Sequence, residues 1–209
     1  MPALAAAAVS MAAPGISICE KYMRSLSGWR RSRPSWSKMQ HHHENPYRPI
    51  KARVEKVISE TPTIKTFVFR PEEALSFAAG QFMLVTIPGV GECAFTPSSD
   101  PAVSETIEFT VMKAGSVTSR LHEIKEGEAV GLRGPYGKPY PIKDYHGKEV
   151  YVVGGGVGLA PLRALLFALN HQIASLKKVE VRFGARSVKD ISYRTAIEDW
   201  KKRERTNIV

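Results

Sequence analysis

Residues 149–163 read Glu-Val-Tyr-Val-Val-Gly-Gly-Gly-Val-Gly-Leu-Ala-Pro-Leu-Arg, and this stretch decides the fold of the second half of the chain. The apolar run Val150–Val153 is typical of a buried parallel strand. Four of the next five residues are glycines, which adopt backbone angles closed to other residues. Good helix formers fill Leu162–Leu169, and Pro161 falls in the first turn, where a missing N–H costs little. A strand, a glycine turn and a helix start together predict a phosphate site, because free N–H groups and the positive helix end attract anions.

The glycine turn has a second interpretation, in which its glycines only allow the helix to pack closely on the strand. We favour phosphate binding because the turn has a strand before it and a helix after it. The spacing departs from the usual dinucleotide fingerprint, since Pro161 stands where a third glycine would be. The next predicted strand, Val179–Phe183, ends in Gly-Ala-Arg at 184–186, with no acid to meet a ribose hydroxyl. A nucleotide is predicted, but the ordinary dehydrogenase pattern fits poorly.

The upstream residues predict an antiparallel β-barrel or sandwich. Short runs rich in apolar, β-branched or aromatic residues alternate there with Pro and Gly turn signals. The predicted strands are Ala52–Ile58, Ile64–Phe69, Phe82–Ile87, Thr106–Met112 and Ala129–Leu132. The order changes to strand, helix, strand near Pro141–Gly147, which we expect to be the domain boundary.

These motifs resemble the ferredoxin–NADP reductase superfamily. The glycine turn at 154–163, with Phe-Gly-Ala-Arg at 183–186, looks like its pyridine-nucleotide half. Gly-Gln-Phe at 80–82 and Gly-Pro-Tyr-Gly at 134–137 resemble turns of its barrel, which precedes the nucleotide domain. The resemblance implies an all-β antiparallel, Greek-key flavin-binding barrel followed by an α/β Rossmann-like parallel sheet that binds a nucleotide.

Three segments are expected, the first from its composition and the other two from this resemblance. Residues 1–44 are a disordered or transit-like extension, residues 45–143 the FAD-binding barrel, and residues 144–209 the NAD(P)-binding domain. The residues implied for NAD(P) binding are Gly154, Gly155, Gly156, Val157, Gly158, Pro161, Gly184 and Arg186. Arg186 and Lys189 could favour a 2′-phosphate, but the family uses Gly-Ala-Arg with either nicotinamide, so NADH and NADPH both stay open.

The flavin motif of the superfamily, Arg-x-Tyr-Ser, falls by position on Cys93-Ala94-Phe95-Thr96. Phe95 keeps a flat face for stacking on the flavin, Thr96 keeps a hydroxyl, and Cys93 replaces the arginine that meets the pyrophosphate. Glu92–Thr96 is closest to the branch that holds hydrogenase gamma subunits, the flavin subunits of anaerobic sulfite reductases and the electron-transfer subunits of dihydroorotate dehydrogenases. The alternative is that Phe95 is plain core and Thr96 an ordinary strand residue.

A second flavin element resembles Thr110–Lys113 and the glycine turn Gly115–Leu121, which leads into a short helix whose N–H groups hold the pyrophosphate in the family. Ser116, Thr118 and Ser119 are suitable helix caps. The residues implied for FAD binding by both elements are Cys93, Ala94, Phe95, Thr96, Thr110, Val111, Met112, Val117 and Thr118. Lys113 and Arg120 are candidates to supply the charge that Cys93 does not. The alternative is a helix cap beside two solvated bases.

The C-terminal residues predict a further helix and strand. Ser-Val-Lys-Asp at 187–190 resembles a capping box that opens a helix to about Glu204, with Ile191, Ile197 and Trp200 as core contacts. A third parallel strand is predicted from Asn207. Because 149–209 is about half of a doubly wound nucleotide domain, we expect a truncated sequence. In this branch the missing part holds a cysteine cluster for a [2Fe-2S] centre. No cysteine follows Cys93, so we expect no cluster ligated by this chain.

The resemblance implies hydride transfer between NAD(P)H and FAD, with electrons passed on to an iron–sulfur partner and a catalytic subunit of a redox complex. The cofactors carry that chemistry, so we assign no catalytic residue and no metal site. Two alternatives stay open: a flavin-binding subunit with no turnover of its own, and an inactive nucleotide- or partner-binding fragment. The terminal electron acceptor is not identified.

Composition agrees with a globular protein of one or two domains, at 209 residues and 43% hydrophobic. No apolar run approaches the roughly 20 residues needed to span a membrane. Cys19 and Cys93 are too few for a disulfide framework, which favours a reducing, cytoplasmic location. The net charge is +10, but no basic helix or stacking platform supports nucleic-acid binding.

Residues 1–40 carry six bases and one acid, and so account for +5 of the net charge. This Ala-, Ser- and Arg-rich segment resembles an organelle transit peptide. The alternative is an upstream start codon, with translation beginning at Met39, which we favour. The three histidines at 41–43 could bind a metal ion loosely, but we expect a solvated tail.

Overall fold

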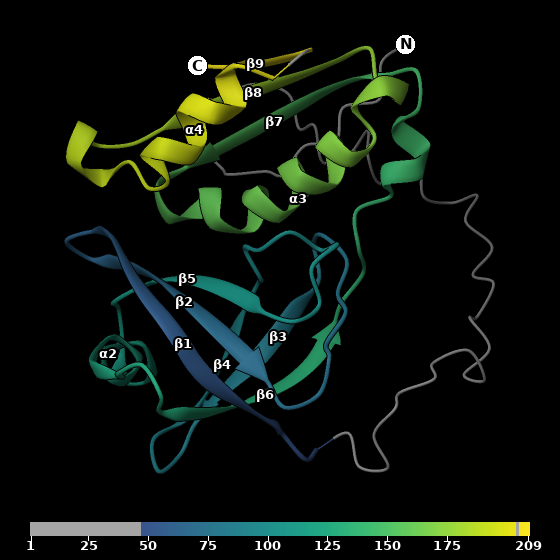
Figure 1. Ribbon diagram of the computed structural model, residues 1–209. Helices are drawn as coiled ribbons and strands as arrows, with labels where there is room; N and C mark the ends of the chain where they lie inside the picture. Colours follow the sequence, from purple (N-terminus) through teal and green to yellow (C-terminus); the bar gives the residue numbers. More distant parts are fainter. Residues whose placement is uncertain (1–46, 204) are drawn as a thin grey trace, which may run out of the picture. The chain divides into compact units, whose positions relative to one another are not determined.

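The computed structural model describes residues 47–203 and 205–209, which form two sheets (Figure 1). A six-stranded antiparallel sheet comes first, and a three-stranded parallel sheet with helices follows it. This order confirms the predicted fold class. The predictions for the extension at 1–44, the start at Met39 and the histidines at 41–43 concern residues outside those that the structure describes.

The antiparallel sheet has the strand order β4-β3-β6-β1-β2-β5. The strands are β1 Ile50–Thr61, β2 Ile64–Pro71, β3 Phe82–Ile87, β4 Gly91–Phe95, β5 Ile107–Met112 and β6 Ala129–Tyr136. All five predicted strands are present, and β6 continues to Tyr136, beyond its predicted end at Leu132. Strand β4 carries Cys93–Phe95 of the proposed flavin motif.

The two edge strands of this sheet meet and close it into a barrel. Strands β4 and β5 stand at opposite ends of the strand order. Just after β4, the N–H of Ser98 donates to the carbonyl of Glu108 in β5 at 2.7 Å. The N–H of Glu108 in turn donates to the hydroxyl of Ser99 at 3.1 Å. The residues that follow the flavin motif are therefore joined to β5.

The barrel interior follows from the two-residue period of its strands. In β1, Ile50, Ala52 and Val54 are buried and the residues between them are exposed. Phe69 of β2 and Phe109 of β5 are fully buried, with ring centroids 5.7 Å apart. Burying each such side chain stabilises the fold by about 1.5–3 kcal/mol, so the alternation is enough to specify the inward face.

The turns at 80–82 and 134–137 that resembled the superfamily contact each other. The side-chain amide of Gln81 accepts a hydrogen bond from the N–H of Ala78 at 2.9 Å. It also donates to the carbonyl of Gly137 at 3.2 Å. One side chain thus ties the start of β3 to the end of β6.

The parallel sheet has the order β7-β8-β9 (Figure 1). Its strands are β7 Glu149–Gly155, β8 Lys178–Gly184 and β9 Thr206–Ile208, and its helices are α3 Leu159–His171 and α4 Arg194–Lys201. The predicted strands at 150–153 and 179–183 are confirmed. Helix α3 begins at Leu159 rather than Leu162, so Pro161 lies in its first turn as predicted.

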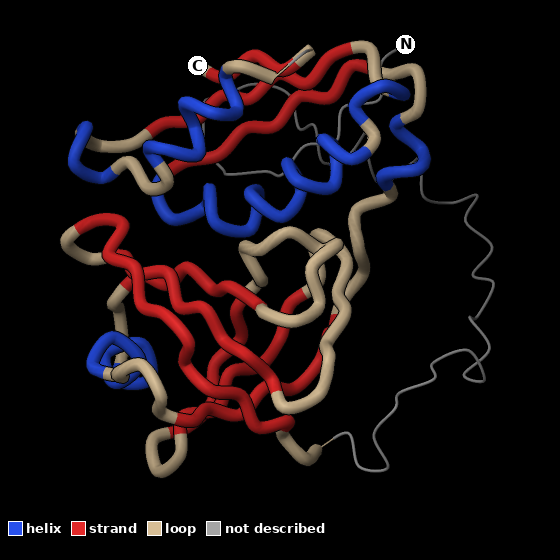
Figure 2. Tube along the Cα trace, in the orientation of Figure 1, coloured by secondary structure: helices blue, strands red, loops and turns tan. Residues whose placement is uncertain are grey.

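Helices α3 and α4 lie on the same face of this sheet (Figures 1 and 2). On β7, Val150 and Val152 are buried, whereas Tyr151 and Val153 are 52% and 63% exposed. The predicted parallel strand is therefore present, but it is buried on one face only. The reason is that both helices pack on one side of the sheet.

The helix predicted from Ser187 to about Glu204 is shorter than expected. Residues 188–190 form a single 3₁₀ turn, in which the hydroxyl of Ser187 donates to the carboxylate of Asp190 at 2.9 Å. The chain then extends, and Tyr193 takes a left-handed conformation with φ +58° before α4 begins at Arg194. The capping-box prediction is wrong at this point because the segment turns to bury Tyr193.

Candidate functional site

The glycine turn after β7 separates into positions that pack and positions that are open. A Cβ added at Gly154 would lie 2.5 Å from Cδ1 of Leu162 in α3. A Cβ added at Gly155 would lie 3.3 Å from the carbonyl oxygen of Gly184 at the end of β8. These two glycines let the helix and the neighbouring strand approach closely, as the packing interpretation required.

Three other glycines border open space. A Cβ added at Gly156, Gly158 or Gly184 would meet no heavy atom within 4 Å. Gly156 has φ +55°, a left-handed conformation that favours glycine. Residues 155 and 184 are paired in the parallel register, so the turn and the end of β8 lie side by side. The structure thus brings the predicted nucleotide residues together around space that side chains do not fill.

The start of helix α3 completes the glycine turn. The N–H of Leu159 donates to the carbonyls of Gly156 and Val157, and no acidic side chain lies in the first turn of the helix. Pro161 has no N–H, and Arg186 is exposed just beyond β8. A helix start with no acidic side chain in its own first turn, facing open glycines, suits a phosphate group. These residues therefore fit the nucleotide that the sequence predicted.

Strand β4 presents the first flavin element. Cys93 pairs with Val85 and Phe95 with Met83, and both β3 partners are buried, so Cys93 and Phe95 lie on the inner side of the sheet. Both are half-buried, whereas Ala94 is exposed. Phe95 packs against the core, which agrees with the alternative that it is a core residue, yet it stays partly accessible. An accessible aromatic face at a sheet edge fits stacking against a flavin.

Thr96 follows β4 and is half-buried. Within residues 47–203 and 205–209 its hydroxyl makes no side-chain hydrogen bond. A half-buried hydroxyl without a protein partner is available to a bound molecule. Thr96 therefore fits the role that the resemblance implied.

In the second flavin element, the side chains of Thr110 and Val111 are buried in the interior. Val111 is a buried core residue, and its carbonyl oxygen lies 2.9 Å from Nε2 of His122. The Thr110 hydroxyl is hydrogen-bonded to the hydroxyls of Thr66 at 2.7 Å and Ser98 at 3.1 Å, and it accepts from Tyr193. Any contact of Thr110 with a flavin is therefore left to its backbone.

Met112 stands apart from these two residues because its side chain is 40% exposed. It ends β5, immediately before the glycine turn that leads into the next helix. The second flavin element thus has a buried part, at the centre of β5, and an accessible part, at its end.

Helix α2, Ser116–Glu123, begins at the predicted glycine turn. Its N-cap is Gly115, not one of the predicted hydroxyl side chains. Instead the Thr118 hydroxyl accepts hydrogen bonds from the N–H groups of Ala114 at 2.9 Å and Gly115 at 2.8 Å. Val117 lies 3.5 Å from the position of an added Cβ at Gly91, so the helix start lies against β4. The two flavin elements are therefore neighbours.

Of the three basic side chains near this turn, two are paired with carboxylates and one is exposed. Arg120 forms an ion pair with Glu128 at 3.1 Å, so it is not free to replace the missing arginine at Cys93. Arg133 of β6 bonds to Glu92, which lowers the pKa of that carboxyl below its usual value. Lys113 is exposed and remains the candidate base.

Two residues missed by sequence reasoning join the barrel to the nucleotide domain. Arg163 of α3 bonds to the carbonyl of Ser98 and the carboxylate of Glu108, and Tyr193 bonds to Thr110. A signal for Arg163 was present, because it is the one charged residue in the run 159–169. Tyr193 had no comparable signal.

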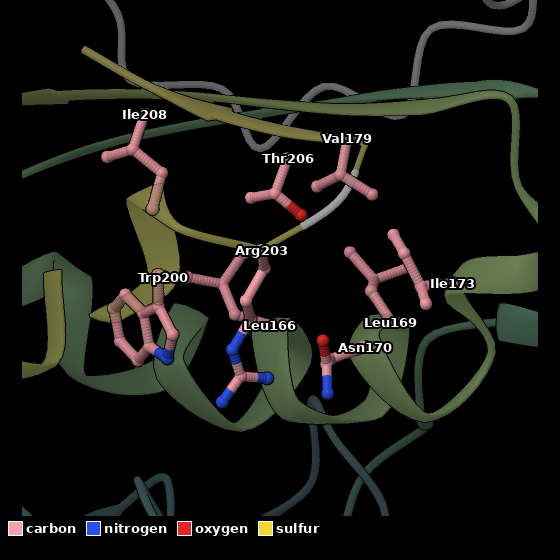
Figure 3. Close-up of a pocket in the computed structure, with 9 residues that line it drawn as sticks. All are labelled: Leu166, Leu169, Asn170, Ile173, Val179, Trp200, Arg203, Thr206 and Ile208. Atoms are coloured by element: carbon pink, nitrogen blue, oxygen red, sulfur yellow. The ribbon is translucent and has the colours of Figure 1, made fainter. Parts of the chain in front are cut away.

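A hollow between α3, α4 and the parallel sheet lies apart from these residues (Figure 3). It is lined by Leu166, Leu169, Asn170, Ile173, Val179, Trp200, Arg203, Thr206 and Ile208. None of the predicted cofactor residues lines it. We therefore regard it as packing space behind the helices.

Two observations concern the described part of the chain. No helix there is long and apolar enough to cross a membrane. In the same residues, no group of three or more His, Cys, Asp or Glu side chains is placed to hold a metal ion.

Comparison with known proteins matches both halves of the chain. The family model described as the oxidoreductase FAD-binding domain matches residues 51–140. The model described as the oxidoreductase NAD-binding domain matches residues 152–209. Together the two matches cover most of the described residues.

Two curated relatives are similar in sequence. The sulfhydrogenase 1 subunit gamma of Pyrococcus furiosus is 40% identical over 135 residues, which are 62% of this chain and 46% of that protein. A probable dihydroorotate dehydrogenase B (NAD(+)), electron transfer subunit, of Methanocella arvoryzae is 42% identical over 118 residues, which are 56% of this chain and 42% of that protein. The chain thus spans less than half the length of either relative.

Solved structures share the fold. The cytochrome b5 reductase domain of Ulva prolifera nitrate reductase matches with a TM-score of 0.65 and 22% identity. The match covers 78% of this chain and 73% of that domain. At this identity the match shows the arrangement of barrel and nucleotide sheet, and nothing about substrates.

Proposed function

We propose a function for this chain, which belongs to the FAD- and NAD-binding oxidoreductases of the ferredoxin–NADP reductase type. In our proposal it binds FAD on the barrel and NAD(P)H at the glycine turn, and it acts as an NAD(P)H-dependent FAD oxidoreductase. The observation that carries the proposal is the open space at Gly156, Gly158 and Gly184, in a chain whose preceding residues match an FAD-binding domain.

The chemistry in this proposal is hydride transfer between the nicotinamide C4 and the flavin N5, which the two cofactors supply when bound. The protein's part is to bind and orient. Phe95 and Thr96 would hold the flavin ring, and the start of α2 would hold its pyrophosphate. Gly156, Gly158 and Gly184 would hold the nucleotide phosphates, with Arg186 beside them, and Gly154 and Gly155 let α3 and β8 approach the turn. No proton-transfer residue is required of the chain.

Electron transfer to a partner extends the proposal. The two curated relatives are, by their names, a hydrogenase subunit and an electron transfer subunit. We propose that this chain likewise passes electrons to an iron–sulfur subunit and a catalytic subunit of a redox complex. The proposed location is the cytoplasm, supported by the low cysteine content, with an organelle as the alternative if residues 1–40 are a transit peptide.

A visible spectrum tests the proposal directly. Purified chain supplied with FAD and passed over a desalting column should keep yellow flavin bands. Those bands should bleach when NADH or NADPH is added without oxygen, and comparison of the two nucleotides measures the preference. Protein that stays colourless after loading would contradict the proposal.

A fragment that binds nucleotide or a partner protein without flavin is the second candidate. Cys93 takes the place of the family's pyrophosphate arginine, and Arg120 is paired with Glu128 instead of replacing it. Weak flavin binding would follow from the lost charge. A protein that stays colourless after loading supports this candidate, and one that keeps its flavin but does not bleach with either nucleotide is a passive carrier.

A further inference from the structure

Arg163 sits one turn after the start of α3 and reaches into the barrel. The described residues belong to one compact unit. The Arg163 side chain is 16% exposed, and Nη1 donates to the carbonyl of Ser98 at 3.1 Å. The same atom is ion-paired with the carboxylate of Glu108 in β5. The contacts of this one side chain thus join the nucleotide helix to both edges of the closed barrel.

The guanidinium group is held between two aromatic rings. Its central carbon lies 5.1 Å from the ring centroid of Phe167, on the next turn of α3, and 4.9 Å from that of Tyr193. A guanidinium group stacked on rings and bonded to a carboxylate has a fixed orientation. Lysine would keep the charge but would lose the stacking on the two rings.

Tyr193 makes the second connection. It is 7% exposed, and its hydroxyl donates to Thr110 in β5. Its N–H donates to the carboxylate of Glu60 at the end of β1 at 2.9 Å. Burial raises the pKa of the Tyr193 phenol, which keeps it protonated as a donor. Its left-handed backbone conformation is rare for a residue with a side chain, which suits a residue held by its contacts.

The barrel residues that receive these contacts belong to the proposed flavin site. Ser98 lies two residues after Thr96, and Thr110 is in the second flavin element. The hydroxyls of Ser98 and Thr110 are bonded to each other at 3.1 Å. On the other side, Arg163 lies on α3, the helix whose N-cap residue is Gly158. Arg163 and Tyr193 therefore connect the flavin strands with the nucleotide turn.

The geometry points to Arg163 and Tyr193 as positioning residues, which set how the nucleotide turn faces the flavin strands and thereby the rate of hydride transfer. This inference rests on the proposed function. Hydride transfer depends steeply on alignment, and a misplacement of about 1 Å can cost on the order of 100-fold in rate. Binding of either cofactor depends on its own cradle, so it should change little.

The experiment compares FAD-loaded wild-type protein with Arg163→Met, Tyr193→Phe and Arg163→Lys. Stopped-flow reduction by NAD(P)H gives a limiting rate and a nucleotide dissociation constant for each protein. We expect the limiting rate to fall at least about tenfold in the first two variants, with the dissociation constant within about twofold of wild type. Arg163→Lys should recover part of the rate because it keeps the pair with Glu108.

Two control variants separate positioning from general packing. His171→Ala removes the contact with Asp100 (2.9 Å) at the other end of α3, and Arg70→Met removes an exposed arginine paired with Glu55. Both should keep the wild-type limiting rate. If Arg163→Met does not fold, Tyr193→Phe, which loses a single hydroxyl, decides the question together with Arg163→Lys.

Amide hydrogen exchange gives a readout that does not depend on turnover. Exchange in residues 96–112, which include the Ser98 N–H bonded to Glu108, should be faster in Arg163→Met and unchanged in Arg70→Met. The inference is overturned if the limiting rates of the Arg163 and Tyr193 variants stay within about twofold of wild type, or fall only in proportion to lost flavin. A wild-type protein that holds FAD but is not reduced overturns the proposed function, and the positioning role with it.

Discussion

Gly158 offers a sharp single-residue test of the nucleotide site. Its backbone is in the ordinary right-handed region (φ −63°), and a Cβ would enter open space. Gly156 is less suitable, because its φ of +55° makes any side chain strained.

In Gly158→Val the protein itself has room for the new side chain. That side chain would, however, occupy the space that a phosphate at the turn needs. We expect NAD(P)H affinity to fall by more than about tenfold, equivalent to about 1.4 kcal/mol, with flavin retention and melting temperature near those of wild type. Fluorescence titration with the reduced nucleotide measures the affinity. Wild-type affinity in this variant would count against the glycine turn as the site.

Gly154→Ala is the matched opposite case. Its Cβ would meet buried Leu162, so we expect a loss of about 1–3 kcal/mol in unfolding free energy from overpacking. Nucleotide affinity of the folded fraction should stay close to that of wild type. Denaturant titration measures the first quantity, and a stability equal to that of Gly158→Val would contradict the division of roles within the turn.

His122 predicts a pH dependence of stability. It is buried beside Phe67, and burial lowers its imidazole pKa, against the opposing effect of the bond to the Val111 carbonyl. The unfolded chain therefore binds a proton near pH 6.5, while the folded chain binds it at a lower pH. Stability from this residue is present above pH 6.5 and is lost as the pH falls below it.

The His122 effect is measured as the difference in melting temperature between wild type and His122→Gln, which keeps a donor for the Val111 carbonyl. Above pH 7 the difference should be constant. Between pH 6.5 and pH 5 the wild type should lose more stability than the variant. Parallel curves over that range would show that the histidine titrates equally in both states.

The start of helix α2 depends on the side chain of Thr118. The Thr118 hydroxyl satisfies two N–H groups of the turn, at Ala114 and Gly115, and so shapes the start of the helix. Thr118→Ala should cost about 1 kcal/mol at this turn, or roughly fivefold in the FAD dissociation constant. Flavin fluorescence titration measures it. Ser119→Ala is the control, and an equal loss there would remove the special role of Thr118.

The boundaries of the strands and helices show which elements can be predicted from sequence patterns. The barrel strands were predicted from alternation of apolar residues, a property that each strand carries by itself. Strand β4 lacks a clear alternation, with a pattern of exposed and half-buried positions, and only the resemblance indicated it. The start of α4 was misplaced because Tyr193 is drawn into the barrel by Glu60 and Thr110, which lie far away in sequence.

At the scale of the whole molecule, the contacts of Arg163 and Tyr193 predict that barrel and nucleotide domain unfold together. FAD at 100 times its dissociation constant stabilises the folded state by about 2.7 kcal/mol. That should raise the melting temperature by about 5–10 °C in a single transition. Calorimetry with and without FAD measures it. Two transitions, with only one shifted by FAD, would show that the domains are not coupled.

The amino-acid sequence by itself determined the strand–glycine–helix unit and the barrel strands other than β4, whereas the residues for each cofactor came from the resemblance and stay a prediction. Glycine's backbone freedom and the period of apolar residues are local properties, so they can be read without the fold. The tertiary structure alone decided which glycines pack and which are open, and which partners Arg163 and Tyr193 have. Arg163 and Glu108 are 55 residues apart, and Tyr193 and Thr110 are 83 apart. Contacts over such distances form only when the two sheets pack, because no local pattern records which distant side chain fills a given space.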